Sequence, residues 1–253
     1  MQKAVANNIV KHRIRYDLEL IANLIKPNSK VLDIGCGDGE LLEFLRNNKN
    51  VDGRGLEISH LQISKAVSRG LSVIQGDAET NLSFYPDRSF NYAVLSQTIQ
   101  ATHDPKKILQ EMLRIAEFAI VSLPNFAHFK NRLHLLLKGT MPVNETIPFE
   151  WYETPNIHFC SIKDFENLCR ELGFKIQKRR YITDKHRVVN LFGCANFLAE
   201  YGIFLITKNE FAATNQEEFI FTKSLVKKLA PMFGEPRGAT CLVNRSKTKG
   251  DYE

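Results

Sequence analysis

The sequence predicts an α/β fold, with a mostly parallel seven-stranded sheet that has helices on both faces. Short apolar runs alternate with segments of helical periodicity, and this alternation is typical of βαβ crossovers. A glycine-rich segment directly follows the first apolar run and opens a helix, as in Rossmann-like domains. With 253 residues, 43% hydrophobic and 25% charged, the chain suits one sizeable globular domain.

The expected helices and strands alternate at regular intervals along the chain. A first helix, 5–25, has apolar residues at nearly helical spacing and ends before Pro27. A strand at 30–34 leads into the glycine-rich turn, and a helix at 40–47 follows it. The remaining helices are expected at 59–69, 105–116, 130–137 and 162–172, and the remaining strands at 53–58, 72–75, 92–96, 118–123, 174–183 and 198–206.

The regular alternation of predicted strands and helices ends after Pro124. Residues 125–155 contain further prolines and the only tryptophan, and we interpret them as a long irregular insertion, a kind of segment that is usually either functional or mobile. The domain is expected to span residues 1–208. Residues 209–253 are polar and uneven, so we expect a C-terminal extension that is partly disordered.

Composition restricts the possible partners. The net charge of +6 raises the possibility of nucleic-acid binding, but much of the excess lies at 175–187, which we interpret as a solvated edge strand. No stretch is long and apolar enough for a membrane span, and the first residues lack the apolar core of a secretory signal. Five scattered cysteines without a CxxC pair predict no disulfide framework and no metal site. We therefore expect a cytoplasmic protein without a membrane or nucleic-acid partner.

The glycine-rich segment predicts a cofactor loop. Gly35, Gly37 and Gly39 give the spacing G-x-G-x-G, which departs from the G-x-G-x-x-G of dinucleotide sites. Asp33 begins this motif, and Cys36 lies within it as a small packing residue rather than a nucleophile.

The charges around this loop select the ligand. Asp33, Asp38 and Glu40 crowd it, and no Lys or Arg occurs between Lys30 and Arg46. Carboxylates repel a pyrophosphate and attract a cation. S-adenosylmethionine (SAM) carries a sulfonium and an amino group, so the sequence favours SAM over NAD.

Three further segments follow strands and complete the predicted cofactor site. Glu57, followed by Ile58, ends the second strand and can accept hydrogen bonds from ribose hydroxyls. Asp77, followed by Ala78, comes after the third strand and can receive the adenine amino group. Ser96 and Gln97 follow the fourth strand and are expected on the floor of the pocket.

No catalytic residue can be assigned from the sequence. Methyl transfer needs a general base only where the acceptor must lose a proton. Four residues in and near the insertion are candidates for the substrate or partner side: His128, Trp151, Tyr152 and His158. We expect His128 near the pocket mouth, the two aromatic residues over a substrate or against the sheet, and His158 as a core histidine between apolar neighbours.

Several strings resemble the MetW family of methionine-biosynthesis proteins. The most specific are LSQTIQA at 95–101 and WYETPNIH at 151–158. The likeness also covers 31–39, 55–57, 73–77, 111–114, 119–122, 124–125, 141–143, 164–165 and 196–200, within an overall span of 13–208. Ser59 departs from the Asp that is frequent in the family, and residues 209–253 extend beyond its usual end.

This resemblance implies a class I methyltransferase fold and a role with homoserine O-acyltransferase in methionine biosynthesis. The leading hypothesis is therefore a SAM-binding protein that supports the acyltransferase as its partner. An active SAM-dependent methyltransferase acting on a small polar metabolite is the alternative. An RNA methyltransferase is a third hypothesis, based on net charge alone.

Overall fold

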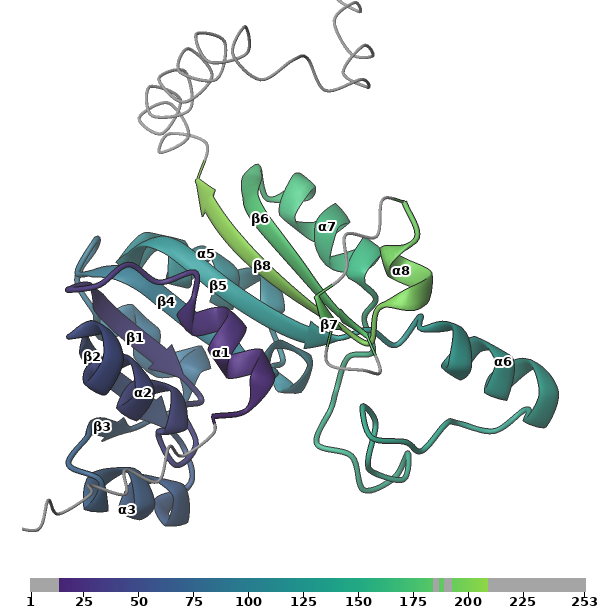
Figure 1. Ribbon diagram of the computed structural model, residues 1–253, viewed down its shortest axis with the longest axis horizontal. Coiled ribbons are helices and arrows are strands. Elements are labelled where there is room, and N and C mark those ends of the chain that lie inside the picture. Colours follow the sequence, from purple (N-terminus) through teal and green to yellow (C-terminus); the bar gives the residue numbers. More distant parts are fainter. Residues whose placement is uncertain (1–13, 184–186, 189–192, 209–253) are drawn as a thin grey trace, which may run out of the picture. The chain divides into compact units, whose positions relative to one another are not determined.

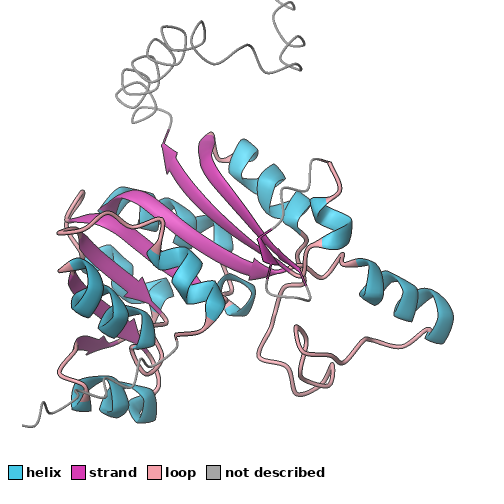
Figure 2. Ribbon diagram, viewed as in Figure 1, coloured by secondary structure: helices cyan, strands magenta, loops and turns pink. Residues whose placement is uncertain are grey.

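A twisted sheet with helices on both faces forms the domain (Figure 1; Figure 2). A computed structural model describes residues 14–183, 187–188 and 193–208. The strands are β1 (Lys30–Ile34), β2 (Asp52–Glu57), β3 (Ser72–Gln75), β4 (Phe90–Ser96), β5 (Ala116–Pro124), β6 (Phe174–Thr183), β7 (Arg187–Val188) and β8 (Tyr201–Lys208). The α-helices are α1 (Tyr16–Ala22), α2 (Glu40–Lys49), α3 (His60–Ser68), α4 (Ala78–Asn81), α5 (Pro105–Ile115), α6 (Phe129–Lys138), α7 (Ile162–Glu171) and α8 (Ala195–Leu198).

The strand order is β3-β2-β1-β4-β5-β8-β6-β7. The first five strands in this order are parallel, whereas β8 pairs antiparallel with both β5 and β6. The predicted fold class is confirmed, and each of the seven predicted strands is present. The two-residue strand β7, which pairs antiparallel with the end of β6, adds an eighth.

Two predicted elements have a boundary that differs from the observed one by more than two residues. The first helix begins at Tyr16, because Arg15 has an extended backbone whose N–H donates to Glu40 Oε1 at 3.0 Å. Residues 5–13 of the predicted helix lie outside the described residues. The last strand begins at Tyr201 rather than 198, since Leu198 ends the short helix α8. The predicted extension, 209–253, also lies outside the described residues.

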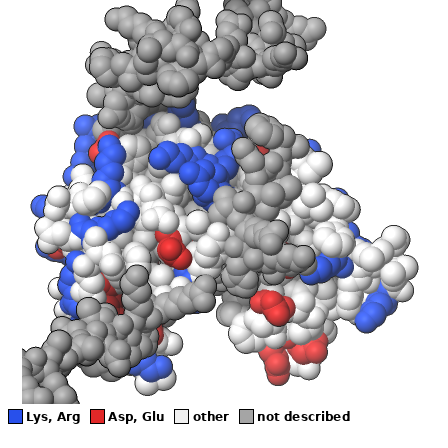
Figure 3. All heavy atoms as spheres, viewed as in Figure 1, with Lys and Arg blue, Asp and Glu red and all other residues white. Residues whose placement is uncertain are grey.

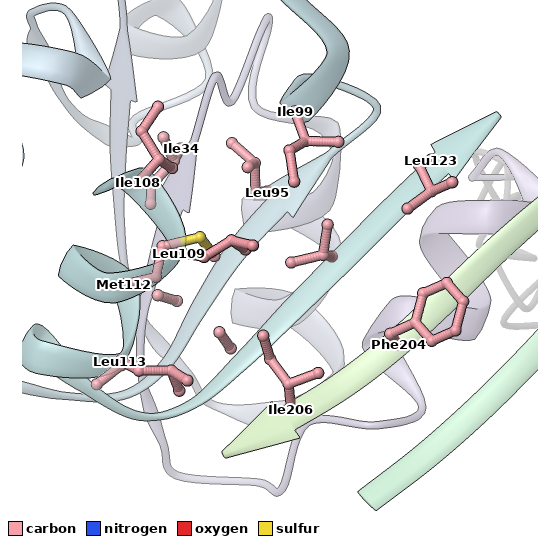
Figure 4. Packing of buried hydrophobic residues seen from close by; sticks show 14 of the residues in the cluster. Ile34, Leu95, Ile99, Ile108, Leu109, Met112, Leu113, Leu123, Phe204 and Ile206 are labelled. Atoms are coloured by element: carbon pink, nitrogen blue, oxygen red, sulfur yellow. The ribbon is translucent and has the colours of Figure 1, made fainter. Parts of the chain in front are cut away.

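Alternating side chains of the strands build two apolar layers. Leu32 and Ile34 of β1 belong to the apolar layer to which α5 and α7 also contribute, part of which Figure 4 shows. Val31 faces the opposite layer, where α1 and α2 contribute Ile21 and Leu45. Because successive residues of a strand point to opposite faces, an apolar strand of this kind must be covered on both sides.

A buried amide joins the segments that follow β5. Asn125 is 1% exposed, and its Nδ2 donates to the carbonyl oxygens of Asn196 (3.1 Å) and Ala199 (2.8 Å). Its Oδ1 accepts from the backbone N–H groups of Ala127 and Ile162. One side chain thereby fixes the starts of the insertion and of α7, and the turn that connects α8 to β8.

We expect Asn125→Asp to destabilise the fold strongly. The carboxylate has no N–H to donate, so two buried carbonyl oxygens lose their partner and face a negative charge. The free energy of unfolding should fall by about 3 kcal/mol. Urea unfolding followed by circular dichroism measures this, with Asn167→Asp on the exposed face of α7 as the control. Equal stability of the two variants would contradict the role given to Asn125.

Candidate functional site

A cavity of about 480 Å³ lies at the carboxyl ends of β1, β2, β3 and β4. Ligands bind at this edge of open α/β sheets. Its lining residues are Ile34, Gly35, Leu56, Glu57, Ile58, Gly76, Asp77, Ala78, Glu79, Gln97, Thr98, Ala101, Thr102, His103, Pro155 and Asn156. Its volume is in the range of small-molecule sites.

The predicted cofactor residues divide into two groups. Those that line the cavity are Gly35, Glu57, Ile58, Asp77, Ala78 and Gln97. Those that do not line it are Asp33, Cys36, Gly37, Gly39 and Ser96. The second group shapes the loop and the strand ends from behind the cavity.

The loop glycines are required by the backbone and by packing. Gly35, Gly37 and Gly39 all have positive φ, which residues with a side chain rarely adopt. A Cβ on Gly39 would lie 2.3 Å from Leu71 Cδ1, so this glycine also allows the loop to pack closely on its neighbours. Gly39 therefore serves the loop's shape, at a position that does not line the cavity.

Glu57 holds the loop through backbone hydrogen bonds. Its Oε2 accepts from the N–H of Gly37 at 2.8 Å, and its Oε1 accepts from those of Ile58 (3.0 Å) and Ser59 (2.9 Å). A carboxylate offers about four acceptor positions, so these contacts leave about one. The side chain is 9% exposed and connects the loop to the segment that begins α3.

Asp33 is a second acid behind the cavity, and it is 3% exposed. Burial, together with the negative charge of Glu57, raises its pKa from 3.8 to about 7, although Arg15 acts in the opposite direction. Burial also raises the pKa of the Cys36 thiol far above its ordinary value. The Cys36 sulfur would lie 2.5 Å from a Cβ on Gly55, which fits a packing residue and not a nucleophile.

Asp77 both lines the cavity and starts a helix. Its Oδ1 accepts from Glu79 N–H at 2.9 Å and so caps α4. Its own N–H donates to Asn81 Oδ1 at 2.8 Å. The capping bond fixes the direction of the carboxylate beside the cavity.

Gln97 connects the cavity to α1. It has φ of 52° and donates from Nε2 to Asp17 Oδ2 at 2.8 Å. Arg15 forms an ion pair with the same carboxylate oxygen at 2.9 Å. Arg15 and Asp17 were not among the predicted site residues, because the helical pattern around Asp17 gives no signal that it meets a residue 80 positions later.

The insertion and the segment after β4 supply a wall that sequence reasoning also missed. Pro155 and Asn156 line the cavity, and Gln100 O accepts from the N–H groups of Ile157 (2.8 Å) and His158 (2.9 Å). His103 and Glu79 lie along the same cavity, and Glu79 Oε1 accepts from His103 N–H. The motif WYETPNIH was the available signal, since its second half is the segment that reaches the site.

The four candidates for the substrate or partner side do not gather at the cavity. His128 is 3% exposed at the start of α6 and is not among the residues that line the cavity. It follows β5, which β4 separates from β1 in the sheet. Trp151 and Tyr152 contact each other edge to face at 5.6 Å and are exposed, so neither covers the cavity. His158 is exposed rather than a core residue, although its backbone N–H donates to the carbonyl oxygen of buried Gln100.

The cavity is complementary to a cation. Glu57, Asp77 and Glu79 line it, and no Lys or Arg is among the lining residues that the structure describes. Buried Asp33 adds a further acid behind them. Within the described part of the chain, no cluster of three or more His, Cys, Asp or Glu could hold a metal ion. No helix among the described residues is long and apolar enough to cross a membrane.

The fold is that of the class I, SAM-dependent methyltransferases. A SAM-dependent methyltransferase from Thermotoga maritima, a possible histamine N-methyltransferase, matches with a TM-score of 0.56 and 23% identity, over 78% of this chain and 91% of that chain. The [4+2]-cyclase SpnF matches with a TM-score of 0.55 and 18% identity, over 76% of this chain and 80% of that chain. The cofactor predicted from the loop charges is the one used by this class.

The chain belongs to the MetW family, described as methionine biosynthesis protein MetW, which residues 15–206 match. The bifunctional methionine biosynthesis protein MetXA/MetW of Rhodopirellula baltica is 33% identical over 174 residues. The match covers 65% of this chain and 28% of that relative, so most of the relative lies outside it. The resemblance seen in the sequence motifs is thus confirmed at the level of the family.

Asp33 should make stability depend on pH. The Asp33 carboxyl group loses its proton near pH 3.8 in the unfolded chain and near pH 7 in the folded protein. The folded state therefore binds more protons between these two pH values. Its contribution to the free energy of unfolding should therefore fall as pH rises through this window, by up to about 1.4 kcal/mol per pH unit. Asp33→Asn should remove that fall.

Urea unfolding at a series of pH values measures this effect. Asp52→Asn, which removes an exposed carboxylate at the start of β2, is the control and should keep the wild-type slope. If Asp33→Asn and the wild type gave parallel curves, Asp33 would titrate at an ordinary pKa in the folded protein.

Proposed function

We propose that this protein binds SAM in the acid-lined cavity and supports homoserine O-acyltransferase in methionine biosynthesis. The observation that carries the cofactor assignment is the carboxylate lining of the cavity, which has no described Lys or Arg to balance it. A sulfonium and an ammonium group offset that negative charge, whereas a pyrophosphate would add to it.

The residues present fit the parts of SAM. Asp77, held by its bond to Glu79 N–H, would receive the adenine amino group. Glu57 has about one acceptor position left for a ribose hydroxyl, and a second hydroxyl requires release of Gly37 N–H. The loop after β1 and the acids behind it would face the charged methionine end. When bound, SAM supplies an electrophilic methyl group.

The acyltransferase partnership is supported by the family and by one relative. The Rhodopirellula protein carries the names MetXA and MetW for a single bifunctional chain, and our chain matches 28% of it. Proteins that are joined in one organism are frequently partners in another. Since SAM lies downstream in the same pathway, a SAM-binding partner of the acyltransferase would report pathway output. A cytoplasmic location stays a prediction.

Methyl transfer to a small polar acceptor is the second candidate. It is favoured by His103, Thr102 and Asn156, polar residues that line the cavity in addition to the predicted cofactor residues. Holding an acceptor in line with the sulfonium can supply much of the rate of such a reaction. Release of S-adenosylhomocysteine on incubation with a metabolite extract would favour this candidate.

Calorimetric titration with SAM tests the cofactor assignment. The wild type should bind saturably, and the double variant Asp33→Ala, Glu57→Ala should bind at least tenfold more weakly, since it loses two acids and the contact that holds the loop. The double variant Asp52→Ala, Glu19→Ala removes two carboxyl groups from exposed positions and should bind as the wild type does. Equal affinity of all three proteins would exclude the cavity as the SAM site.

The partnership is tested with purified homoserine O-acyltransferase from the same organism. The two proteins should co-elute on size exclusion, and the initial rate of homoserine acylation should rise several-fold when this protein is added. If this protein reports pathway output to the acyltransferase, SAM should change either the affinity or the rate. Separate elution together with an unchanged rate would contradict the role in methionine biosynthesis proposed here.

A further inference from the structure

The insertion contains a helix that is anchored only at its first turn among the described elements. Phe129 of α6 packs on Phe197 of α8 with 5.7 Å between ring centroids, and the Arg132 guanidinium lies 5.6 Å from the same ring. Asn131 is buried and accepts from Asn144 Nδ2 at 2.8 Å. The rest of α6 projects beyond the sheet and its covering helices (Figure 1).

The projecting part of α6 has an exposed apolar stripe. Leu133, Leu136 and Leu137 share one helix face, since they are spaced at i, i+3 and i+4. Leu136 is 80% exposed and Leu137 is 73% exposed. A helix of 10 residues is marginal in water, and it gains stability mainly by packing an apolar face. The stripe therefore requires a partner surface that the described residues do not supply.

Acidic residues accompany this stripe. The loop after α6 has exposed carboxylates at Glu145, Glu150 and Glu153, and Figure 3 shows acidic side chains gathered on that part of the insertion. A two-fold symmetric contact between copies of this chain places the same patch on both sides. Because α6 also has the basic residues Lys130, Arg132 and Lys138, such a contact between copies is one of the outcomes that the test below distinguishes.

We infer that this surface, formed by Leu133, Leu136 and Leu137 with Glu145, Glu150 and Glu153, docks homoserine O-acyltransferase. The inference rests on the proposed function and adds to it the place of contact. The partner should present an apolar groove for the leucines, bordered by Lys or Arg that face the carboxylates. The MetXA/MetW relative favours this occupant, because one chain there carries both names.

The same insertion connects the docking surface to the cofactor cavity. It ends at Pro155, which lines the cavity, and leads directly into Asn156, which also lines it, and into the N–H groups of Ile157 and His158, which donate to Gln100 O. The acyltransferase at α6 and SAM in the cavity would therefore contact the same continuous segment of the chain. Binding of SAM and of the acyltransferase should change each other's affinity by the same factor.

The test compares charge substitutions on two exposed apolar helix faces. The variant Leu136→Lys, Leu137→Lys changes α6, and the control Leu61→Lys, Val67→Lys changes α3, where these residues are 66% and 53% exposed. Biolayer interferometry gives the Kd of each protein for the acyltransferase, and calorimetry gives the Kd for SAM. The α6 variant should bind the acyltransferase roughly ten- to hundredfold more weakly, while the control keeps wild-type affinity and both keep SAM binding.

The outcomes separate this inference from the proposed function. If the wild type and the α6 variant bind the acyltransferase equally, the docking surface lies elsewhere and the partnership stands. If the wild type does not bind the acyltransferase, both proposals fail. If light scattering shows a wild-type dimer that the α6 substitutions split while acyltransferase binding is unchanged, the stripe is a contact between copies and the inference is overturned.

Discussion

The carboxylate of Glu57 is the contact on which the cofactor edge of this domain depends. It accepts backbone N–H groups from the glycine loop after β1 and from the segment that begins α3. The loop has positive φ at three glycines and carries few side chains that could hold it, so an external acceptor must fix its path. A charged acceptor makes stronger hydrogen bonds to N–H groups than a neutral one does. Together with Leu56 O, which accepts from the N–H groups of Gly35 and Cys36, this side chain at the end of β2 positions the loop.

This arrangement has an electrostatic cost that points to the ligand. Glu57 and Asp33 are buried near each other, and the charge of one raises the pKa of the other. Arg15 offsets part of the repulsion, but it is already paired with Asp17 at the start of α1. A cationic ligand in the cavity would lower the free energy of both carboxylates in their ionised forms. Acids that destabilise the empty pocket therefore favour binding of a cation, which relates the stability of the fold to its function.

The part of the site that strand ends form could be predicted from the sequence. The part that depends on helix packing and strand order could not. Strand ends lie at one edge of a parallel sheet, so the positions of Gly35, Glu57 and Asp77 follow once the strands are identified. No such rule places Asp17 against Gln97, because that contact depends on how α1 crosses the sheet. The burial of His128 likewise depends on where β5 lies in the strand order. Periodicity also did not separate Leu198 from the strand after it, because α8 is only one helical turn long.

The strand ends that form the cofactor edge are common to many proteins of this fold, so the fold by itself says little about activity. A methyltransferase and a cyclase both match this fold, so the cofactor edge alone does not define a reaction. What differs between proteins of one fold is the chain that covers the site, and here that chain is the insertion after β5. Its final residues form a wall of the cavity, while its helix exposes leucines away from the cavity. A segment that served only to enclose an acceptor would bury its apolar residues over the cavity. The exposed leucines of α6 instead favour a protein that uses its cofactor site in contact with another protein.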